Sequence, residues 1–289
     1  MPFIRQASVY VGPLPEFAGG GALGDAIRLD GDGSRESFAI SFSVKKTLLS
    51  NPNTSTITIT NLGRPVRDAL QQRGLAVRLL GGYRDTGVRT LASGSLLSAL
   101  PVRNGTDIDT TFTMLDGYGG MSRGVYQRTF DGRIPIRDVV ADAATRLPGV
   151  TVGNIDVDGF TGSRGRVFNG KTTDVLNALA EQYGFSWSVQ NGVFQALQDN
   201  RASTRVFRIS AEEGNLIDAQ PQLSGPFQER TGITIVAYLN PILRPGDTVD
   251  LRSTVNPQLN GRYKVHTLSF DGTTTSGDWT MSIESLRQF

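Results

Sequence analysis

A phosphate-loop pattern is the first feature of this sequence that could support chemistry. Gly165, Gly170, Lys171 and Thr172 match G-x-x-x-x-G-K-[ST], the pattern in which backbone N–H groups and a lysine surround nucleotide phosphates. A working loop also needs a strand directly before its first glycine and an acid at another strand end. Residues 161–164 are loop-like instead, and residues 166–168 are strand-like. We therefore expect Val167 in extended backbone and no strand before Gly165, with a triphosphatase acting through Lys171 as the alternative.

The remaining residues that could act catalytically have no partners that the sequence identifies. His266 is the only histidine and no cysteine is present, which excludes thiolate sites and sites built from several histidines. His266 lies within a strand-like run, without a nucleophile motif elsewhere. Carboxylate pairs could hydrolyse a glycosidic bond, as in a cell-wall hydrolase. The pairs are Glu212/Glu213, Asp156/Asp158 and Asp247/Asp250, and all are predicted in turns, where acids bind backbone N–H groups.

Two further features favour structural roles over ligand binding. Asp30 and Asp32 begin a pattern like a calcium loop, but Arg35 occupies the position of the required glycine, so a turn is expected. Trp187 and Trp279 could line a sugar site in a carbohydrate-binding module, but in strands they are typical of a core or an interface. We expect no catalytic, cofactor-binding or metal-binding residues.

The elements that position these residues are mostly short strands. Alternation of apolar and polar residues predicts strands over 7–11, 38–44, 55–60, 76–80, 90–99 and 108–115, with a helix over 65–72. The glycines at 19–21 predict a loop. Residues 117–133 look irregular and mark a first domain boundary. Later strands are predicted over 231–239, 248–253, 262–270 and 280–286, as a second barrel.

Between the two β regions, the pattern changes to mixed helix and strand. A helix is predicted over 134–147 and a strand over 150–157. A second helix follows Lys171, with Thr172 or Thr173 as its cap, and ends at Gly184. Strands over 185–189 and 193–197 are predicted to pair across Asn191-Gly192, a strong hairpin signal.

Composition limits the function classes. The 289 residues are long enough for about two domains. The 29 basic and 27 acidic residues nearly cancel, which gives no support for a nucleic-acid-binding face. Only four of the basic residues are lysines, namely Lys45, Lys46, Lys171 and Lys264. No stretch has the composition of a signal peptide or a membrane span, so we expect a soluble chain.

Several ordered motifs resemble phage baseplate hub proteins. The run 231–247, continuing through 259–265 to Gly277-Asp278-Trp279, is similar to their C-terminal domain. Residues 46–53, 59–62 and 81–83 are similar to their N-terminal tube-like domain. Asn169 to Leu176, through Trp187, resembles their middle segment. The resemblance, to the late control protein D or T4 hub-like family, covers most of residues 38–289.

This resemblance implies a mainly β fold with a small α+β middle, in which an α/β unit joins two tail-tube-like β-barrels. The implied domains are 1–122, 123–200 and 201–289, with barrels that discontinuous segments complete. The implied function is that of a non-enzymatic virion component, assembled in the host cytoplasm. In it, a homotrimeric ring adapts the hexameric tail tube to the trimeric spike and encloses the channel for DNA and tape measure protein. Other implied partners are the distal tail protein and other baseplate proteins. A hub of a type VI secretion or other contractile injection apparatus is the close alternative.

Overall fold

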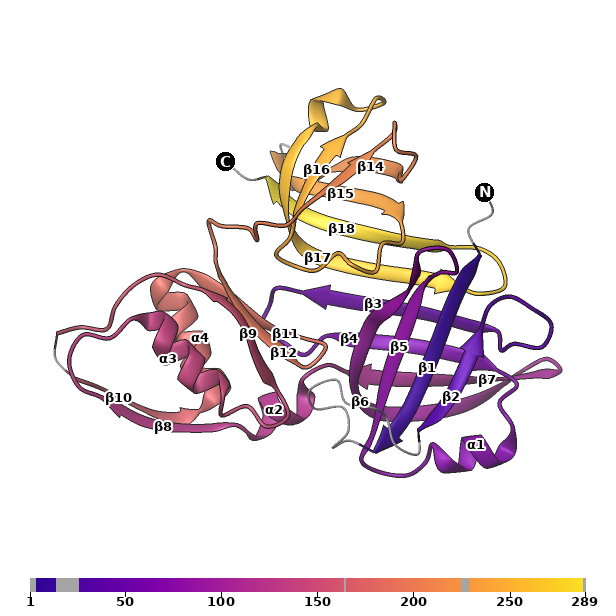
Figure 1. The fold of residues 1–289 in the computed structure, drawn as a ribbon, viewed down its shortest axis with the longest axis horizontal. Helices are drawn as coiled ribbons and strands as arrows, with labels where there is room; N and C mark the ends of the chain where they lie inside the picture. Colours follow the sequence, from indigo (N-terminus) through magenta and orange to yellow (C-terminus); the bar gives the residue numbers. More distant parts are fainter. Residues whose placement is uncertain (1–3, 14–25, 164, 225–228, 288–289) are drawn as a thin grey trace.

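A computed structural model describes residues 4–13, 26–163, 165–224 and 229–287 of the chain. The fold is mainly β, as the sequence predicts (Figure 1). The first β part consists of β1 (Arg5–Pro13), β2 (Ile27–Gly31), β3 (Ile40–Thr47), β4 (Thr54–Thr60), α1 (Arg64–Ala69), β5 (Leu75–Tyr83), β6 (Gly87–Asn104) and β7 (Asp107–Leu115).

The middle unit follows and contains most of the helical residues. It consists of α2 (Tyr118–Arg123), β8 (Val125–Phe130), α3 (Ile136–Ala144), β9 (Thr151–Asp156), β10 (Arg166–Lys171), α4 (Thr172–Tyr183), β11 (Phe185–Gln190) and β12 (Val193–Gln198). No described helix is both long enough and apolar enough to cross a membrane.

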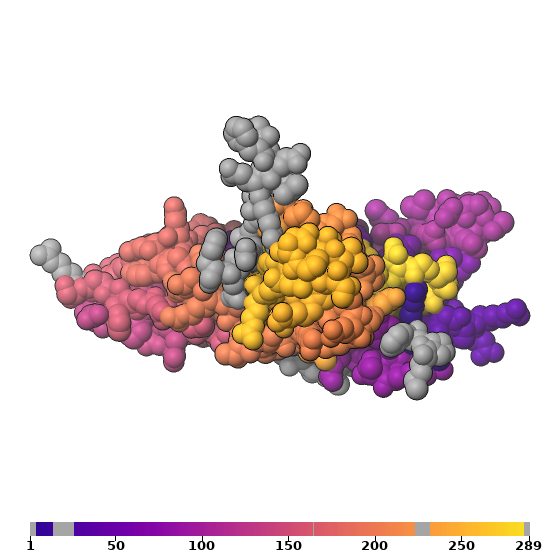
Figure 2. All heavy atoms as spheres, turned by 90° about the horizontal axis from the view of Figure 1, so that it is seen from above, coloured from indigo at the N-terminus to yellow at the C-terminus, as the bar shows by residue number. Residues whose placement is uncertain are grey.

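The second β part completes the chain. It consists of β13 (Val206–Ser210), β14 (Leu216–Ser224), β15 (Glu229–Tyr238), β16 (Thr248–Arg252), the 3-10 turn η2 (Pro257–Leu259), β17 (Gly261–Thr273) and β18 (Trp279–Arg287). Seen from above, the molecule is elongated, with the middle unit at one end and the first β part at the other (Figure 2). The second β part overlaps the others in this view because it lies above them in Figure 1.

One sheet of 13 strands runs through both β parts. Its order is β14-β15-β18-β17-β3-β4-β7-β6-β5-β1-β2, with β16 beside β17 and β13 beside β16. The two parts meet where β17 pairs with β3, for example Phe270 with Val44 (Figure 1). β3 can join them because Ile40, Phe42 and Val44 face the core while Ser41 and Ser43 alternate outward.

Two separate hydrophobic cores hold the fold together. The larger one contains buried residues of both β parts, among them Phe42, Phe112, Phe270 and Ile283. The middle unit has its own core, which includes Trp187 and Phe194. The domain boundaries at 122/123 and 200/201 stay a prediction.

Most of the predicted elements are confirmed, but two predictions about elements of the middle unit are wrong and three strands are missed. Residues 117–133 are not irregular, because α2 and β8 lie there and β8 pairs with β10. Neither Thr172 nor Thr173 caps α4: Lys171 is the N-cap residue, and no side chain bonds to this helix end. The strands β2, β13 and β14 were not predicted, since their apolar alternation is short. The loop predicted at Gly19–Gly21 lies outside the described residues.

β6 and β17 have the same construction in the two β parts. Each begins paired with one neighbour, β5 or β16, then bends at a bulge and continues paired with β7 or β18. The bulge residues are Leu97 in β6 and His266 in β17. Ser95 lies opposite Ala76 just as Lys264 lies opposite Thr248, so the register before the bend also agrees. The chain therefore contains an internal structural repeat.

Candidate functional site

The phosphate-loop match does not form a phosphate site in this fold. Gly165 follows a bend at Ser163 and not a strand, and Val167 lies in β10, so both expectations are confirmed. β10 is laddered antiparallel to β8, with Val167 opposite Thr129 and Lys171 opposite Val125. Its backbone groups serve this two-stranded ladder and cannot wrap around a phosphate.

The candidate carboxylate pairs form ion pairs. The prediction that all of them lie in turns is wrong for two, because Asp156 ends β9 and Asp250 lies in β16. Arg201 bridges Asp156 and Asp158 on the surface. Arg208 contacts both Glu212 and Glu213 in the same way. With an arginine between its members, neither pair has the free acid and base that glycoside hydrolysis requires.

Asp247 and Asp250 are also held by neighbours. Asp247 accepts hydrogen bonds from the Ser203 hydroxyl at 2.8 Å and from the Arg244 N–H at 2.9 Å. Burial raises the pKa of this carboxyl, against the effect of those bonds. Asp250 pairs with Arg252. The two acids therefore stabilise a turn and a strand.

The other candidate residues are also structural. Trp187 is buried, stacks on Phe194, and donates its indole N–H to Asn177 at 3.0 Å. Trp279 is buried against Phe42 in the larger core, so neither ring can stack on a sugar. Asp32 accepts the Ser34 N–H at 2.9 Å in a turn, as expected. In the described ranges, no group of three or more His, Asp or Glu residues could hold a metal.

His266 occupies a mid-strand position, without an acid or a nucleophile at hydrogen-bonding distance among the described residues. It is half-buried, and burial lowers the pKa of its imidazole. Its backbone carbonyl accepts the N–H of Leu48 at 3.1 Å, so this bulge residue helps to join β17 to the chain that leaves β3.

A polar junction that sequence reasoning missed connects the middle unit to the first β part. The turn between β11 and β12 at Asn191-Gly192 has positive φ at both residues, as a type I′ turn requires. The buried carboxylate of Asp116 accepts both of the turn's N–H groups, from Asn191 and, at 3.0 Å, from Gly192. This residue therefore fixes the tip of the hairpin.

Side chains around the junction complete the attachment. Asn53 donates to the carbonyl of Val189 at 3.0 Å, and Gln190 donates to the carbonyl of Thr47 at 2.7 Å. Lys46 donates to the Asn191 side chain at 3.0 Å. The end of the hairpin thus bonds both to the last residues of β3 and to the loop that follows β3.

Burial shifts the pKa values of the two charged groups in opposite directions. It lowers the pKa of Lys46 to about 8 and raises the pKa of Asp116 to about 6, although each group's charge opposes the other's shift. Lys264 makes a second attachment, since its buried ammonium donates to the carbonyls of Gln198 and Asp199 at 3.2 and 3.3 Å. Two of the four lysines therefore hold the middle unit in place.

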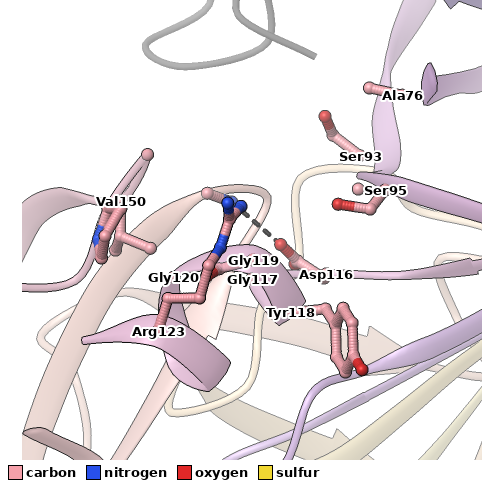
Figure 3. A pocket seen from close by; sticks show the side chains of 14 residues that line it. Ala76, Ser93, Ser95, Asp116, Gly117, Tyr118, Gly119, Gly120, Arg123 and Val150 are labelled. Atoms are coloured by element: carbon pink, nitrogen blue, oxygen red, sulfur yellow. Dashed lines mark hydrogen bonds between the residues drawn. The ribbon is translucent and has the colours of Figure 1, made fainter. Parts of the chain in front are cut away.

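A pocket of about 270 Å³ opens at this junction (Figure 3). Ser93 and Ser95 lie on its β side, and Val150 and Arg123 lie on the side of the middle unit. Asp116, at the end of β7, lies between the two walls. The pocket marks the seam between the two bodies.

The outward face of the large sheet is lined with hydroxyl groups. Across the strands, Ser43 lies opposite Thr56, which lies opposite Thr113, and in the other direction Ser43 lies opposite Asp271. The Thr58 and Thr111 hydroxyls hydrogen-bond at 3.0 Å. Other members of this hydroxyl face are Ser41, Ser269, Thr273, Thr280 and Ser282. The face crosses from one β part to the other without interruption, and its charged members include Lys45, Asp271 and Glu284.

After its bulge, each of the equivalent strands β6 and β17 has one edge paired with β7 or β18 and a second edge, which we call a sheet joint. One of these two joints is filled and the other is open. After its bend, β17 is flanked by β18 and by β3. β6 is flanked after its bend by β7 alone among the described strands. Leu97, Leu100 and Val102 are 49, 60 and 61% exposed along this stretch. We call residues 96–104 the open edge of β6.

The fold that these elements define is one found in tail proteins of phages and in a component of the type VI secretion system. The chain superposes on a 43 kDa tail protein of prophage MuSo2 from Shewanella oneidensis with a TM-score of 0.65 and 8% identity, over 97% of each chain. A tail protein from Neisseria meningitidis gives a TM-score of 0.63 and 11% identity, over 97% of this chain and 96% of that one.

The type VI secretion component, from Escherichia coli, is similar with a TM-score of 0.59 and 8% identity, over 88% of this chain and 75% of that one. Neither a protein-family model nor a curated protein sequence matches the chain. The likeness is therefore one of fold along nearly the whole length.

Proposed function

We propose that this chain is a structural hub subunit of a phage tail baseplate. Three copies form a ring that adapts the hexameric tail tube to the trimeric central spike. The fold shared with tail proteins over nearly the whole chain supports this role. The structural partners of the candidate acids, His266 and the tryptophans support an assembly role without catalysis or a cofactor.

The observation that carries the proposal is the half-filled repeat. The joint at β17 is filled by β3 of the same chain, while the equivalent joint at β6 is open. Within the repeat, the strand that corresponds to β3 is β14, and β14 is a terminal strand of the sheet. A chain with one open joint and one unused end adds copies head to tail, and such heterologous contacts close into rings when the rotation allows.

The hydroxyl face would line the channel of this ring. It is the uncovered side of the strands that run through both β parts, opposite the larger core. Its serine and threonine side chains offer hydrogen bonds but little charge, and weak phosphate contact lets DNA pass without being held. The channel would also contain the tape measure protein before ejection.

The remaining assignments follow from this role. The partners are the tail tube or distal tail protein, the central spike, the tape measure protein and other baseplate proteins, and the chain resides in the virion tail after assembly in the host cytoplasm. The likeness to the type VI secretion component also favours a second candidate, the hub of a contractile injection apparatus. The genes beside this one distinguish the two.

Sedimentation with a charge variant tests the ring contact. The wild-type chain should sediment as a trimer, with three times its 31.2 kDa mass, or should form complexes that contain three copies when a tube or spike partner is added. Leu100→Lys with Val102→Lys should remain monomeric, because ammonium groups would be placed in the contact. Val255→Lys, at a residue that is 84% exposed elsewhere, is the matched control and should assemble normally. A wild-type chain that stays monomeric with every partner contradicts the proposal.

A further inference from the structure

The filled joint shows which residues of the open edges would bond to a second copy. The Leu48 N–H donates to the His266 carbonyl, and antiparallel pairs bond at every second residue. Val44 and Phe270, which are paired four residues away from these, therefore direct their N–H and carbonyl groups toward each other. In β17, Phe270 lies four residues after the bulge residue His266. The corresponding position in β6, four residues after the bulge residue Leu97, is Pro101.

The equivalent of Val44 follows from the cross-strand pairs. Ala99, Phe112, Ile57 and Phe42 lie in one row across the first β part. The corresponding row in the second β part is Leu268, Ile283, Ile235 and Ala219. Val44 is two residues beyond Phe42, and the residue two beyond Ala219 is Pro221.

Both residues at this bonding position of the open joint are therefore prolines. Proline has no N–H, and in sheets it is confined to edges, to first residues and to bulges. Pro101 and Pro221 are both exposed. If a second copy joined its β14 to β6 as β3 joins β17, these prolines would face each other where Val44 and Phe270 exchange two hydrogen bonds.

Neighbouring edge groups are already bonded within the chain. The Ala99 carbonyl accepts from the Gln71 side chain at 2.9 Å. On β14, the Ala219 N–H donates to the Asp218 carboxylate at 2.8 Å, and the Ala219 carbonyl accepts from Asn256 at 2.9 Å. The two edges are thus closed by local side chains as well as by proline, which is how proteins prevent edge-to-edge association.

We propose that Pro101 and Pro221 are a matched pair that prevents copies of this chain from joining their sheets. Two strand edges that the internal repeat shows to be complementary are kept from forming a ladder, although they can still lie side by side. Contacts between copies then depend on exposed side chains, chiefly Leu97, Leu100 and Val102 on β6 and Ile217 on β14. The inference rests on the proposed function only in taking a second copy as the partner.

Replacement of both prolines tests the pair. Pro101→Thr with Pro221→Thr restores two N–H groups at one bonding position, and threonine favours strands. The double variant should self-associate at a concentration about tenfold lower than the wild type, a difference of about 1.4 kcal/mol per contact. Each single variant should change association much less, since the opposite proline remains. Pro148→Thr, in the exposed turn after α3, is the control. Equal association of double variant and wild type overturns the proposal.

The absence of cysteine allows the register to be tested directly. In the double variant, Leu100 and Gln222 of different copies would lie opposite each other, one residue from the proline position. Leu100→Cys and Gln222→Cys, introduced together there, should form disulfide-linked oligomers under mild oxidation, and Leu100→Cys with Asp218→Cys should form few. Equal cross-linking of the two combinations would overturn the inference.

The two proposals fail in different ways. A wild-type trimer with a double variant that associates no more strongly refutes the proline inference and leaves the hub function standing. A wild-type chain that stays monomeric with all partners, combined with a double variant that forms linked oligomers in the expected register, refutes the ring and leaves the inference standing.

Discussion

Removal of the Asp116 carboxylate should loosen the middle unit. In Asp116→Ala, the N–H groups of Asn191 and Gly192 lose their acceptor, and each buried donor left unpaired costs about 1–3 kcal/mol. Lys46 also loses an opposite charge that favours its protonated form. Because both effects come from one carboxylate, they overlap, and we expect a net loss of about 4 kcal/mol.

The two tryptophans allow this loss to be located. Trp187 lies in the core of the middle unit and Trp279 in the larger core. In guanidinium unfolding of single-tryptophan variants, made with Trp187→Phe or Trp279→Phe, the substitution at 116 should lower the midpoint reported by Trp187 more than that reported by Trp279. Asp85→Asn, at an exposed turn, is the control. A loss below about 1 kcal/mol at Trp187 would refute the anchoring role.

Three further predictions concern particular residues. Since burial raises the pKa of Asp116 from 3.8 to about 6, the folded chain holds a proton that the unfolded chain releases between these values. This carboxyl should therefore contribute more stability at pH 4 than at pH 7, and the stability difference between wild type and Asp116→Ala should shrink as pH rises through 6; a difference independent of pH contradicts this. Lys171→Ala should change the unfolding free energy by less than about 0.5 kcal/mol, because this lysine is an exposed residue at the end of a strand. Neither the wild type nor the variant should bind Mg-ATP saturably; saturable binding by the wild type that the variant loses would contradict this prediction. Gly246→Ala should cost about 2–4 kcal/mol in thermal unfolding, since φ is +93° and a Cβ would overlap Leu197; an unchanged midpoint would count against this packing.

Local patterns predicted much of the fold because their physical causes are local. The apolar alternation at Ile40, Phe42 and Val44 fixes β3, and Asn191-Gly192 fixes the hairpin turn. Gly184 ends α4 in the left-handed region, as its sequence position predicts. β14 escaped prediction because Pro221 and four polar residues interrupt its pattern, and it is a strand only because β15 pairs with it.

The junction could not be predicted, because its residues are distant in sequence. Asp116 and Asn191 are 75 residues apart, and Asp116 looks like an ordinary acid at the end of a strand. One signal was present. In a chain with 29 basic residues, lysine occurs at only four positions, and two of these, Lys46 and Lys264, are buried at the seam. At the seam, the compact lysine ammonium can direct its three N–H donors to the carbonyl and amide acceptors, whereas a planar arginine guanidinium would not match their positions.

The phosphate-loop match illustrates why a pattern needs its context. Gly170 and Lys171 end a strand that is fully laddered to β8, and Thr172 begins the helix after it. The same residue types that surround a phosphate elsewhere here make a strand-to-helix turn. Its backbone N–H groups therefore serve the fold.

Electron microscopy of the purified chain tests the proposed ring. We expect ring-shaped particles with threefold symmetry and a central opening lined by the hydroxyl face, alone or after addition of a tube or spike partner. Particles of single 31.2 kDa chains only, with and without those partners, would contradict it.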